Sequence, residues 1–158
     1  MAVKERIQVG DRAPDFELPS QTGERVRLSD LLQQRAVVLY FYPKDETPGC
    51  TREACAFRDS YEVFAEAGAE VVGVSSDSVE SHGGFASHHR LPFVLLSDEG
   101  DAVRRLYGVR RTLGLLPGRV TYVIDRQGVV RQVFSSQLGA ERHVGEALAT
   151  LKRIAAAD

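Results

Sequence analysis

The sequence predicts an α/β fold with a mixed central sheet flanked by helices, and three observations carry this prediction. Short apolar runs rich in β-branched residues alternate with stretches of helical pattern between residues 36 and 107, which is typical of parallel strands joined by helical crossovers. Two more apolar runs follow residue 118, separated only by the turn 125–128, and so favour an antiparallel hairpin. The length of 158 residues suits one domain spanning residues 1–158.

The individual elements are expected in the following order. Residues 14–18 and 25–28 are strand-like and flank a turn-rich link, so they predict an N-terminal β-hairpin. Ser29 is expected to cap a short helix that ends at Leu32. The other expected strands cover residues 36–42, 70–75, 93–96, 120–124 and 129–134, and the other expected helices cover 51–68, 77–90, 101–107 and 140–154.

Composition excludes several classes of function. The formal net charge is −2, and acidic and basic residues are interspersed, so there is no electrostatic footprint for nucleic acid or an anionic membrane. The sequence contains no apolar run long enough for a transmembrane helix, no secretory signal pattern in residues 1–10, and no glycine-rich phosphate loop after a strand. Two cysteines in such a chain indicate a reducing compartment, and the cytoplasm is expected.

The stretch Tyr40–Asp59 contains both cysteines. A buried strand is expected to end at Tyr42, and a polar loop then leads into a helix, so Cys50 is expected at a helix N-terminus. Unpaired N–H groups and the helix dipole favour an anion there, and a thiol in that position tends toward thiolate. The hydroxyl of Thr47 is expected to donate to the sulfur or to a molecule approaching it. The competing interpretation is that Cys50 is a buried small hydrophobic residue.

Cys55 lies five positions after Cys50. In an ideal helix this spacing separates the two Cα atoms by about 8.6 Å, whereas a disulfide requires about 4.4 to 6.8 Å. The pair can therefore bridge only if the first turns of the helix unwind, which predicts a redox cycle with a local unfolding step. The alternative is that Cys55, between two alanines, simply fills the core.

Pro43, Thr47 and Cys50 reproduce the pattern Pro-x-x-x-Thr-x-x-Cys, which resembles the active-site signature of peroxiredoxins. Cys55, after a four-residue gap, resembles the resolving cysteine of the Q-type, or bacterioferritin-comigratory, subfamily. Residues 9–16 are similar to the opening of peroxiredoxins, where a hairpin precedes a thioredoxin-like core. The resemblance thus implies a thioredoxin-like fold with an N-terminal β-hairpin extension.

The resemblance also implies a reaction. Such a chain would be a thiol-specific peroxidase, in which the Cys50 thiolate attacks hydrogen peroxide or an organic hydroperoxide and becomes a sulfenic acid. Cys55 would then form an intramolecular disulfide with Cys50, and thioredoxin or a similar dithiol would restore both thiols. Pro43 would shield the site, no bound cofactor is needed, and Q-type relatives are commonly monomeric.

Arg119 opens the expected strand at 120–124. In peroxiredoxins an arginine at the matching place lies against the peroxidatic cysteine, so the resemblance implies contact between Arg119 and Cys50. A fixed cation there would favour both the thiolate and the transition state, and the guanidinium fork can hydrogen-bond sulfur and oxygen together. The competing interpretation is a surface arginine at the start of a strand.

Other charged residues near the cysteines receive simpler interpretations. Glu53 is attributed to the helix dipole, and Arg58 to an i, i+4 pair with Glu62. The apolar segment Leu113–Pro117 is expected to line the mouth of the pocket or to bind a partner.

The four histidines carry no predicted function. His82, His88 and His89 are attributed to a polar helix face, because no second acidic cluster flanks them in the sequence, and no metal site is predicted. His143 has no partner that the sequence identifies.

Two rival functions stand beside the peroxidase. A thioredoxin-like disulfide oxidoreductase would share the fold, but the chain lacks Cys-x-x-Cys, and Thr47 and Arg119 would then have no task. A non-catalytic redox sensor or holdase chaperone would use Cys50 as an oxidation switch.

Overall fold

A five-stranded mixed sheet forms the centre of the computed structural model, which describes residues 7–109, 119–136 and 139–157. The strand order is β5-β4-β3-β6-β7. β3 runs parallel to β4 and β4 parallel to β5, whereas β6 is antiparallel to both β3 and β7. The strands are β3 (Ala36–Phe41), β4 (Ala69–Ser75), β5 (Val94–Ser97), β6 (Val120–Ile124) and β7 (Val130–Ser135). The predicted mixed sheet is therefore confirmed.

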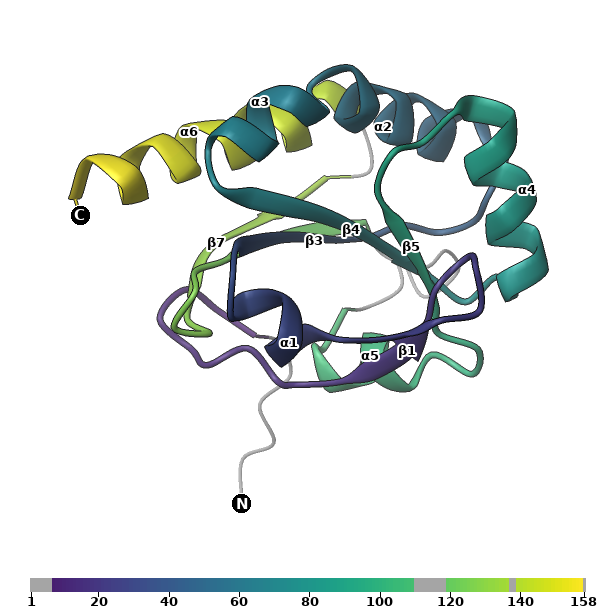
Figure 1. Ribbon diagram of the computed structural model, residues 1–158, viewed down its shortest axis with the longest axis horizontal. Coiled ribbons are helices and arrows are strands. Elements are labelled where there is room, and N and C mark those ends of the chain that lie inside the picture. Colours follow the sequence, from purple (N-terminus) through teal and green to yellow (C-terminus); the bar gives the residue numbers. More distant parts are fainter. Residues whose placement is uncertain (1–6, 110–118, 137–138, 158) are drawn as a thin grey trace.

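Helices cover both faces of this sheet (Figure 1). One face carries α2 (Pro48–Asp59), α3 (Tyr61–Glu66), α4 (Val79–His89) and α6 (Ala140–Ala157). The other face carries α1 (Leu28–Leu32), α5 (Ala102–Leu106) and the antiparallel hairpin of β1 (Glu17–Pro19) and β2 (Arg25–Arg27). The helices that connect β3 to β4 and β4 to β5 lie on the same face of the sheet, as expected for consecutive parallel crossovers that add strands in one direction.

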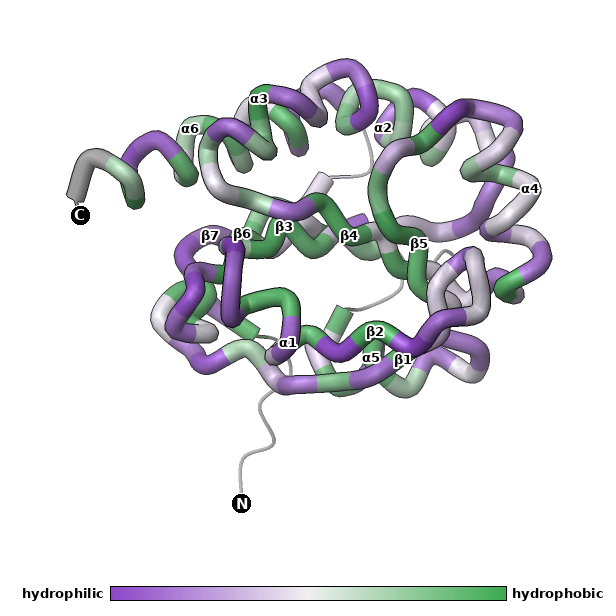
Figure 2. The backbone as a smooth tube through the Cα atoms, viewed as in Figure 1, coloured by the Kyte–Doolittle hydropathy of each residue, from purple (hydrophilic) through white to green (hydrophobic). Residues whose placement is uncertain are grey.

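Each face of the sheet has its own hydrophobic core. Every residue of β3 is buried, and its side chains alternate: Val37, Leu39 and Phe41 enter the core beneath α1 and α5, whereas Val38 and Tyr40 enter the core beneath α2 and α6. This is the period of two expected of a strand covered on both sides. Hydrophobic residues accordingly concentrate on the inner strands (Figure 2).

The helix after β3 differs from its prediction at both ends. It begins at Pro48 instead of Thr51, because proline fits the first helical position, where its missing N–H leaves no bond unmade. It ends at Asp59, because the next residue, Ser60, has a φ of −105° and a ψ of 7° and leaves the helical region, and α3 follows as a separate helix. The break rules out the predicted pairing of Arg58 with Glu62. Arg58 instead pairs with Asp59 at 3.0 Å and donates to the carbonyl of His89 at 2.8 Å.

The start of α1 also differs from its prediction. The helix begins at Leu28, with Arg27 as an N-cap residue that makes no side-chain capping bond. Ser29 therefore does not cap it. Its amide and hydroxyl both donate to the carboxylate of Asp15, each at 2.9 Å, and so tie the helix to the segment before the hairpin.

The remaining predicted elements are present, with boundaries shifted by a few residues. In α4, Ser78 is the N-cap and accepts from the amide of Ser81 at 3.0 Å, so the helix starts two residues after its predicted start. Within the described ranges, no helix combines the length and apolar character needed to cross a membrane.

Candidate active site

The register of the sheet brings Arg119 to the helix that holds Cys50. Phe41, the last residue of β3, pairs with Val120, the first residue of β6. Because the two strands are antiparallel, the residue before β6 lies at the edge of the sheet from which the chain leaves β3 and enters α2. Residues 69 positions apart in the sequence therefore meet there.

Cys50 lies in the first turn of α2, against the sheet. It is 1% exposed, and Nη2 of Arg119 donates to its Sγ at 3.3 Å. No acidic side chain occupies the first turn of α2, so the positive end of the helix dipole acts on the sulfur unopposed from that turn. The predicted contact of Arg119 with Cys50 is present, so the guanidinium and the positive end of the helix dipole both act on the sulfur.

Gly49 allows the guanidinium to approach this closely. A β-carbon at this position would lie 3.0 Å from Nη2 of Arg119, closer than the van der Waals contact of a carbon and a nitrogen. A Pro-Gly pair is common immediately before or at the start of a helix. The glycine also creates the space in which Arg119 reaches the sulfur.

Glu53 has a different role from the one assigned to it. It lies in the second turn of α2, is fully buried, and accepts from Nη1 of Arg119 at 2.6 Å. One guanidinium therefore joins Cys50 and Glu53, which lie one turn apart on the same helix. Burial raises the pKa of Glu53 to about 7, although the charge and hydrogen bond of Arg119 oppose the shift. The attribution of Glu53 to the helix dipole was wrong, because a buried arginine needs a buried acid as partner.

His143 on α6 completes the buried group around Arg119. Its Nδ1 lies 2.7 Å from Oγ1 of Thr121 and 3.4 Å from Oε2 of Glu53, and its Nε2 lies 2.9 Å from the carbonyl oxygen of Ser136. Burial lowers the pKa of His143 to about 4, so the ring is neutral at physiological pH. Since a carbonyl only accepts, Nε2 carries the proton and Nδ1 accepts the hydroxyl hydrogen of Thr121. His143 thus has partners that the sequence alone did not identify.

Thr47 and Pro43 border the same loop, each half-buried. Thr47 is the N-cap residue of α2, but its hydroxyl donates to the carbonyl oxygen of Lys44 at 2.8 Å, not to the sulfur as predicted. Its oxygen lone pairs therefore stay available to accept a hydrogen bond. Pro43 follows the last residues of the buried run from β3 and begins the turn into the loop.

A buried polar network fixes the loop between β3 and α2. The carboxylate of Asp45 accepts from the hydroxyl of Tyr42 at 2.6 Å and from Ser81 at 2.8 Å, and it lies 2.7 Å from Nδ1 of His82. The other ring nitrogen of His82 lies 2.9 Å from the carbonyl oxygen of Leu96. His82 is fully buried, so its attribution to a polar helix face was wrong.

Arg104 on α5 supports the loop from the other face of the sheet. It is 5% exposed and donates from Nη2 to the carbonyl oxygen of Tyr42 at 2.9 Å. This carbonyl comes directly after β3, so the bond holds the point at which the chain turns toward Cys50.

Cys55 lies in the same uninterrupted helix as Cys50 but is half-buried. It borders a groove between α2 and α6, together with Arg52, Asp59, Glu141 and Val144. Both thiols are free, and helical geometry keeps their Cα atoms about 8.6 Å apart. The segment Leu113–Pro117, expected at the pocket mouth, lies outside the described residues.

The fold and the site together define a redox enzyme that works through a thiol. A cysteine in the first turn of a helix, buried against a mixed sheet and hydrogen-bonded to arginine, has the features of an activated sulfur nucleophile.

Comparison with known proteins identifies the family. The model of the AhpC/TSA family matches residues 9–133. Peroxiredoxin Q, chloroplastic, from Triticum aestivum is 51% identical over 150 residues, which cover 94% of this chain and 69% of that protein. The crystal structure of peroxidoxin BcpB from Mycobacterium tuberculosis matches with a TM-score of 0.88 and 47% identity, over 94% of this chain and 99% of that one.

A further structure bears on the chemistry. The bacterioferritin comigratory protein of Xanthomonas campestris, studied for its alkyl peroxide reduction activity, matches with a TM-score of 0.81 and 34% identity, over 89% of this chain and 92% of that one. The chain belongs to the AhpC/TSA family, and its relatives within that family are peroxiredoxin Q and bacterioferritin comigratory proteins. Its fold is therefore thioredoxin-like and its class of activity is thiol peroxidase, acting on hydroperoxides at the expense of a thiol reductant.

Proposed function

We propose that Cys50 reduces hydrogen peroxide and organic hydroperoxides, that Cys55 resolves the oxidised sulfur as an intramolecular disulfide, and that thioredoxin or a similar dithiol recycles the enzyme. One observation carries the proposal: Nη2 of Arg119 lies 3.3 Å from Sγ of Cys50, with both residues buried at the start of α2. A cation held beside sulfur in a dry site has a larger effect than the same cation in water.

In the first step, the Cys50 thiolate attacks the terminal oxygen of the hydroperoxide. A sulfur–oxygen bond forms, the oxygen–oxygen bond breaks, and the leaving alkoxide or hydroxide takes up a proton to become alcohol or water. Sulfur is oxidised by two electrons to the sulfenic acid, and the peroxide is reduced by the same two. Arg119 faces the sulfur where charge moves onto oxygen, and the oxygen of Thr47 can accept the hydrogen of the peroxide. Pro43 shields the site.

In the second step, the thiolate of Cys55 attacks the sulfur of the sulfenic acid. The disulfide forms and hydroxide leaves, which takes up a proton to become water. Because α2 is continuous through both cysteines, this step requires its first turns to unwind. A dithiol reductant then restores both thiols by disulfide exchange, so that electrons balance over the cycle.

The assembly and the compartment are part of the proposal. A single domain acting as a monomer is proposed, because the exposed large hydrophobic residues among the described ones are scattered over separate segments: Val9, Val63 and Leu106. The cycle needs a reducing compartment, such as the cytoplasm. Several of the most similar relatives are chloroplastic, so a plastid also suits the protein.

The experiment is a peroxide turnover assay with thioredoxin and its reductase, combined with stopped-flow measurement of Cys50 oxidation. Cys50→Ser should abolish both signals. Cys55→Ser should leave the first oxidation unchanged and abolish turnover, because the sulfenic acid then has no resolving thiol within the chain. Cys50 oxidation no faster than that of a free thiol would favour a redox sensor instead, and turnover retained by Cys55→Ser would show that another thiol resolves.

A further inference from the structure

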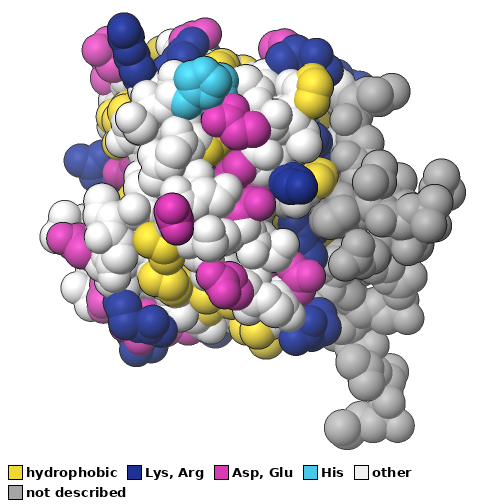
Figure 3. Space-filling model, turned by 90° about the vertical axis from the view of Figure 1, so that its right-hand side faces the viewer, with side chains coloured by type: hydrophobic (Ala, Val, Ile, Leu, Met, Phe, Trp, Pro, Cys, Tyr) yellow, Lys and Arg dark blue, Asp and Glu magenta, His cyan; other side chains and the backbone are white. Residues whose placement is uncertain are grey.

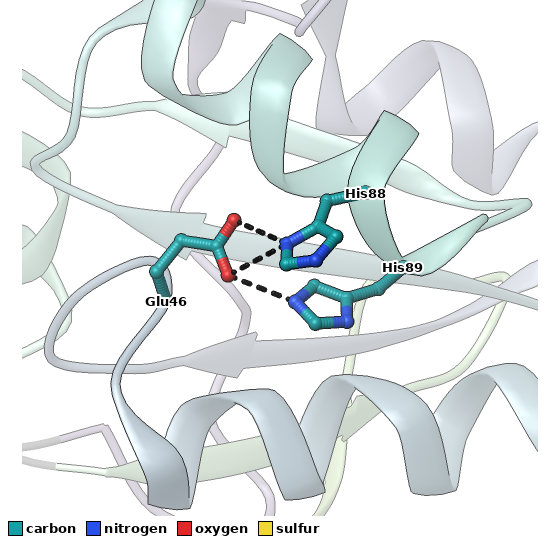
Figure 4. A group of neighbouring side chains, drawn as sticks. All are labelled: Glu46, His88 and His89. Carbon is teal, nitrogen blue, oxygen red and sulfur yellow. Dashed lines mark hydrogen bonds and ion pairs between the residues drawn. The ribbon is translucent and has the colours of Figure 1, made fainter.

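A carboxylate and two imidazoles meet on the surface beside the Cys50 loop (Figure 4). Glu46 comes from the loop between β3 and α2, and His88 and His89 come from the C-terminal turn of α4. Nδ1 of His88 lies 3.2 and 2.9 Å from the two carboxylate oxygens, and Nε2 of His89 lies 2.8 Å from one of them. A view of the α4 side of the molecule shows histidine surface directly beside acidic surface (Figure 3).

We propose that Glu46, His88 and His89 form a binding site for a divalent transition-metal ion, for which Zn²⁺ is the best match. Two imidazole nitrogens and one carboxylate oxygen are a donor set that zinc accepts, with a fourth position left for water. Ligand atoms about 2.0–2.2 Å from a tetrahedral ion lie about 3.4 Å from one another. The three ligand atoms here already lie within 4.8 Å of one another. The nitrogen–oxygen pairs at 2.9 and 2.8 Å would have to open by about half an ångström, and the two imidazole nitrogens would have to come to about 3.4 Å from each other, to admit the ion.

The charge and exposure of this group suit a cation that arrives from solvent. The side chain of His88 is 67% exposed and that of Glu46 is 47% exposed, whereas that of His89 is 17% exposed and more firmly held. The ion would replace the hydrogens that now lie between the imidazoles and the carboxylate.

The backbone at Glu46 presents its side chain to the two histidines. Glu46 has a φ of 63°, a left-handed conformation that few residues other than glycine, asparagine and aspartate adopt. The group cannot be recognised in the sequence, because its acid lies 42 and 43 positions before the histidines. Only the fold brings the loop and the end of α4 together.

A second cluster of metal-binding residue types is less suited to an ion. Asp45, Asp77 and His82 also lie close together, but their atoms are already committed. Asp77 accepts from the hydroxyl of Ser75 at 2.6 Å and from the amide of Asp45 at 2.8 Å, and both ring nitrogens of His82 have partners. A metal would have to displace several buried hydrogen bonds there, whereas the surface group would lose only those between its own members.

Isothermal titration calorimetry with ZnCl₂ tests the site. The protein should be untagged and carry Cys50→Ser and Cys55→Ser, because thiolates bind zinc themselves. One ion per chain is expected. Glu46→Gln, His88→Ala and His89→Ala should each weaken binding at least tenfold, because loss of a direct ligand costs more than loss of a group that only orients one. Glu80→Gln makes the same charge change as Glu46→Gln, at the other end of α4. It should bind Zn²⁺ as tightly as the background protein, which carries only Cys50→Ser and Cys55→Ser.

Two results would overturn the proposal: no saturable binding by the background protein, or affinities unchanged in both histidine variants. Amide exchange gives an independent readout that needs no enzymatic activity. An ion shared by Glu46 and the end of α4 ties the loop to that helix, so Zn²⁺ should slow exchange at residues 45–51 in the background protein and not in His88→Ala. Binding that leaves exchange there unchanged would place the ion elsewhere on the molecule and also contradict the proposal.

Discussion

The two cysteines occupy the same helix in opposite environments. Cys50 is 1% exposed, packs against the sheet and contacts a buried guanidinium. Cys55 is half-buried beside a groove between α2 and α6 that Arg52 also lines, and no hydrogen bond from a guanidinium to its sulfur is present among the described residues. The first environment stabilises charge on sulfur, and the second leaves a thiol able to move. In the proposed cycle this difference would suit Cys50 to attack on the peroxide and Cys55 to resolution of the product.

The largest expected effect on the rate of Cys50 oxidation comes from replacing the planar guanidinium of Arg119 while keeping its positive charge. Arg119→Lys leaves a cation near Cys50, but a single ammonium cannot hold Cys50 and Glu53 in the same geometry. We expect Cys50 oxidation to slow about 100-fold or more, the range found when one preorganised donor is removed from an active site. The rate of Cys50 oxidation by peroxide is measured by stopped flow in both proteins.

The matched control is Arg52→Lys, which makes the same change at an exposed position of α2. Its oxidation rate should equal that of the wild type. Equal rates for Arg119→Lys and the wild type would show that the contact with sulfur is only structural.

The second prediction uses the pKa of Glu53, which lies at about 7 in the folded chain against an ordinary 4.5. Between these values the folded state holds more protons than the unfolded state, so the stabilising contribution of this group is complete below pH 4.5 and is lost as pH rises through 7. The free energy of unfolding should fall by about 3 kcal/mol over this pH range. Urea unfolding of the reduced protein at pH 5 and pH 8 measures it.

Glu53→Gln cannot titrate and serves as the reference for this measurement. The wild type should lose free energy of unfolding relative to Glu53→Gln between pH 5 and pH 8. His143, with its pKa lowered to about 4, changes stability in the opposite direction, and the difference between the two proteins removes its contribution. A constant difference across this range would mean that Glu53 stays ionised.

A smaller effect is expected from Gly49→Ala. The added methyl would lie 3.0 Å from Nη2 of Arg119, so the guanidinium must shift by a few tenths of an ångström away from the sulfur. We expect oxidation about tenfold slower, since small displacements of a positioned group reduce rates strongly. Stability should stay equal or rise, because alanine is the better helix former. A slower rate caused by unfolding would instead appear as a lower melting temperature.

The smallest expected effect is a change in amide exchange within α2. Disulfide formation should speed amide exchange at residues 51–57, because the bridge needs the first turns of α2 to unwind. Residues 28–32 of α1, on the other face of the sheet, provide the internal reference and should exchange at the same rate in both states. Protection of 51–57 that is equal before and after oxidation would contradict the unwinding step.

Local patterns in the sequence were enough to predict the strand, the loop and the helix that position Cys50. The apolar run of β3, the following loop and the helix beyond it each depend on neighbouring residues, and the motif with Cys50 resembles a known one. The same resemblance predicted the contact between Arg119 and Cys50. The loop and the helix were placed to within three residues at the start of α2.

The partners of these residues could not be predicted, because they depend on the register of distant strands. Glu53 looks like an ordinary acid near a helix start until Arg119 is placed beside it. His82 looks like a surface residue until the loop brings Asp45 to its ring. In both cases an ionisable side chain on a helix is buried only because a segment far away in the chain covers it.

The bridge that Arg119 makes between Cys50 and Glu53 also bears on the reduction potential of the protein. It spans one turn of α2, so it exists only while that turn is helical. In the proposed cycle its stabilisation would therefore belong to the dithiol state and be lost when Cys50 and Cys55 form the disulfide. For a two-electron couple, about 1.4 kcal/mol of such stabilisation raises the potential by about 30 mV. The buried ion pair thus makes the disulfide a stronger oxidant, and electrons flow to it readily from a reducing partner.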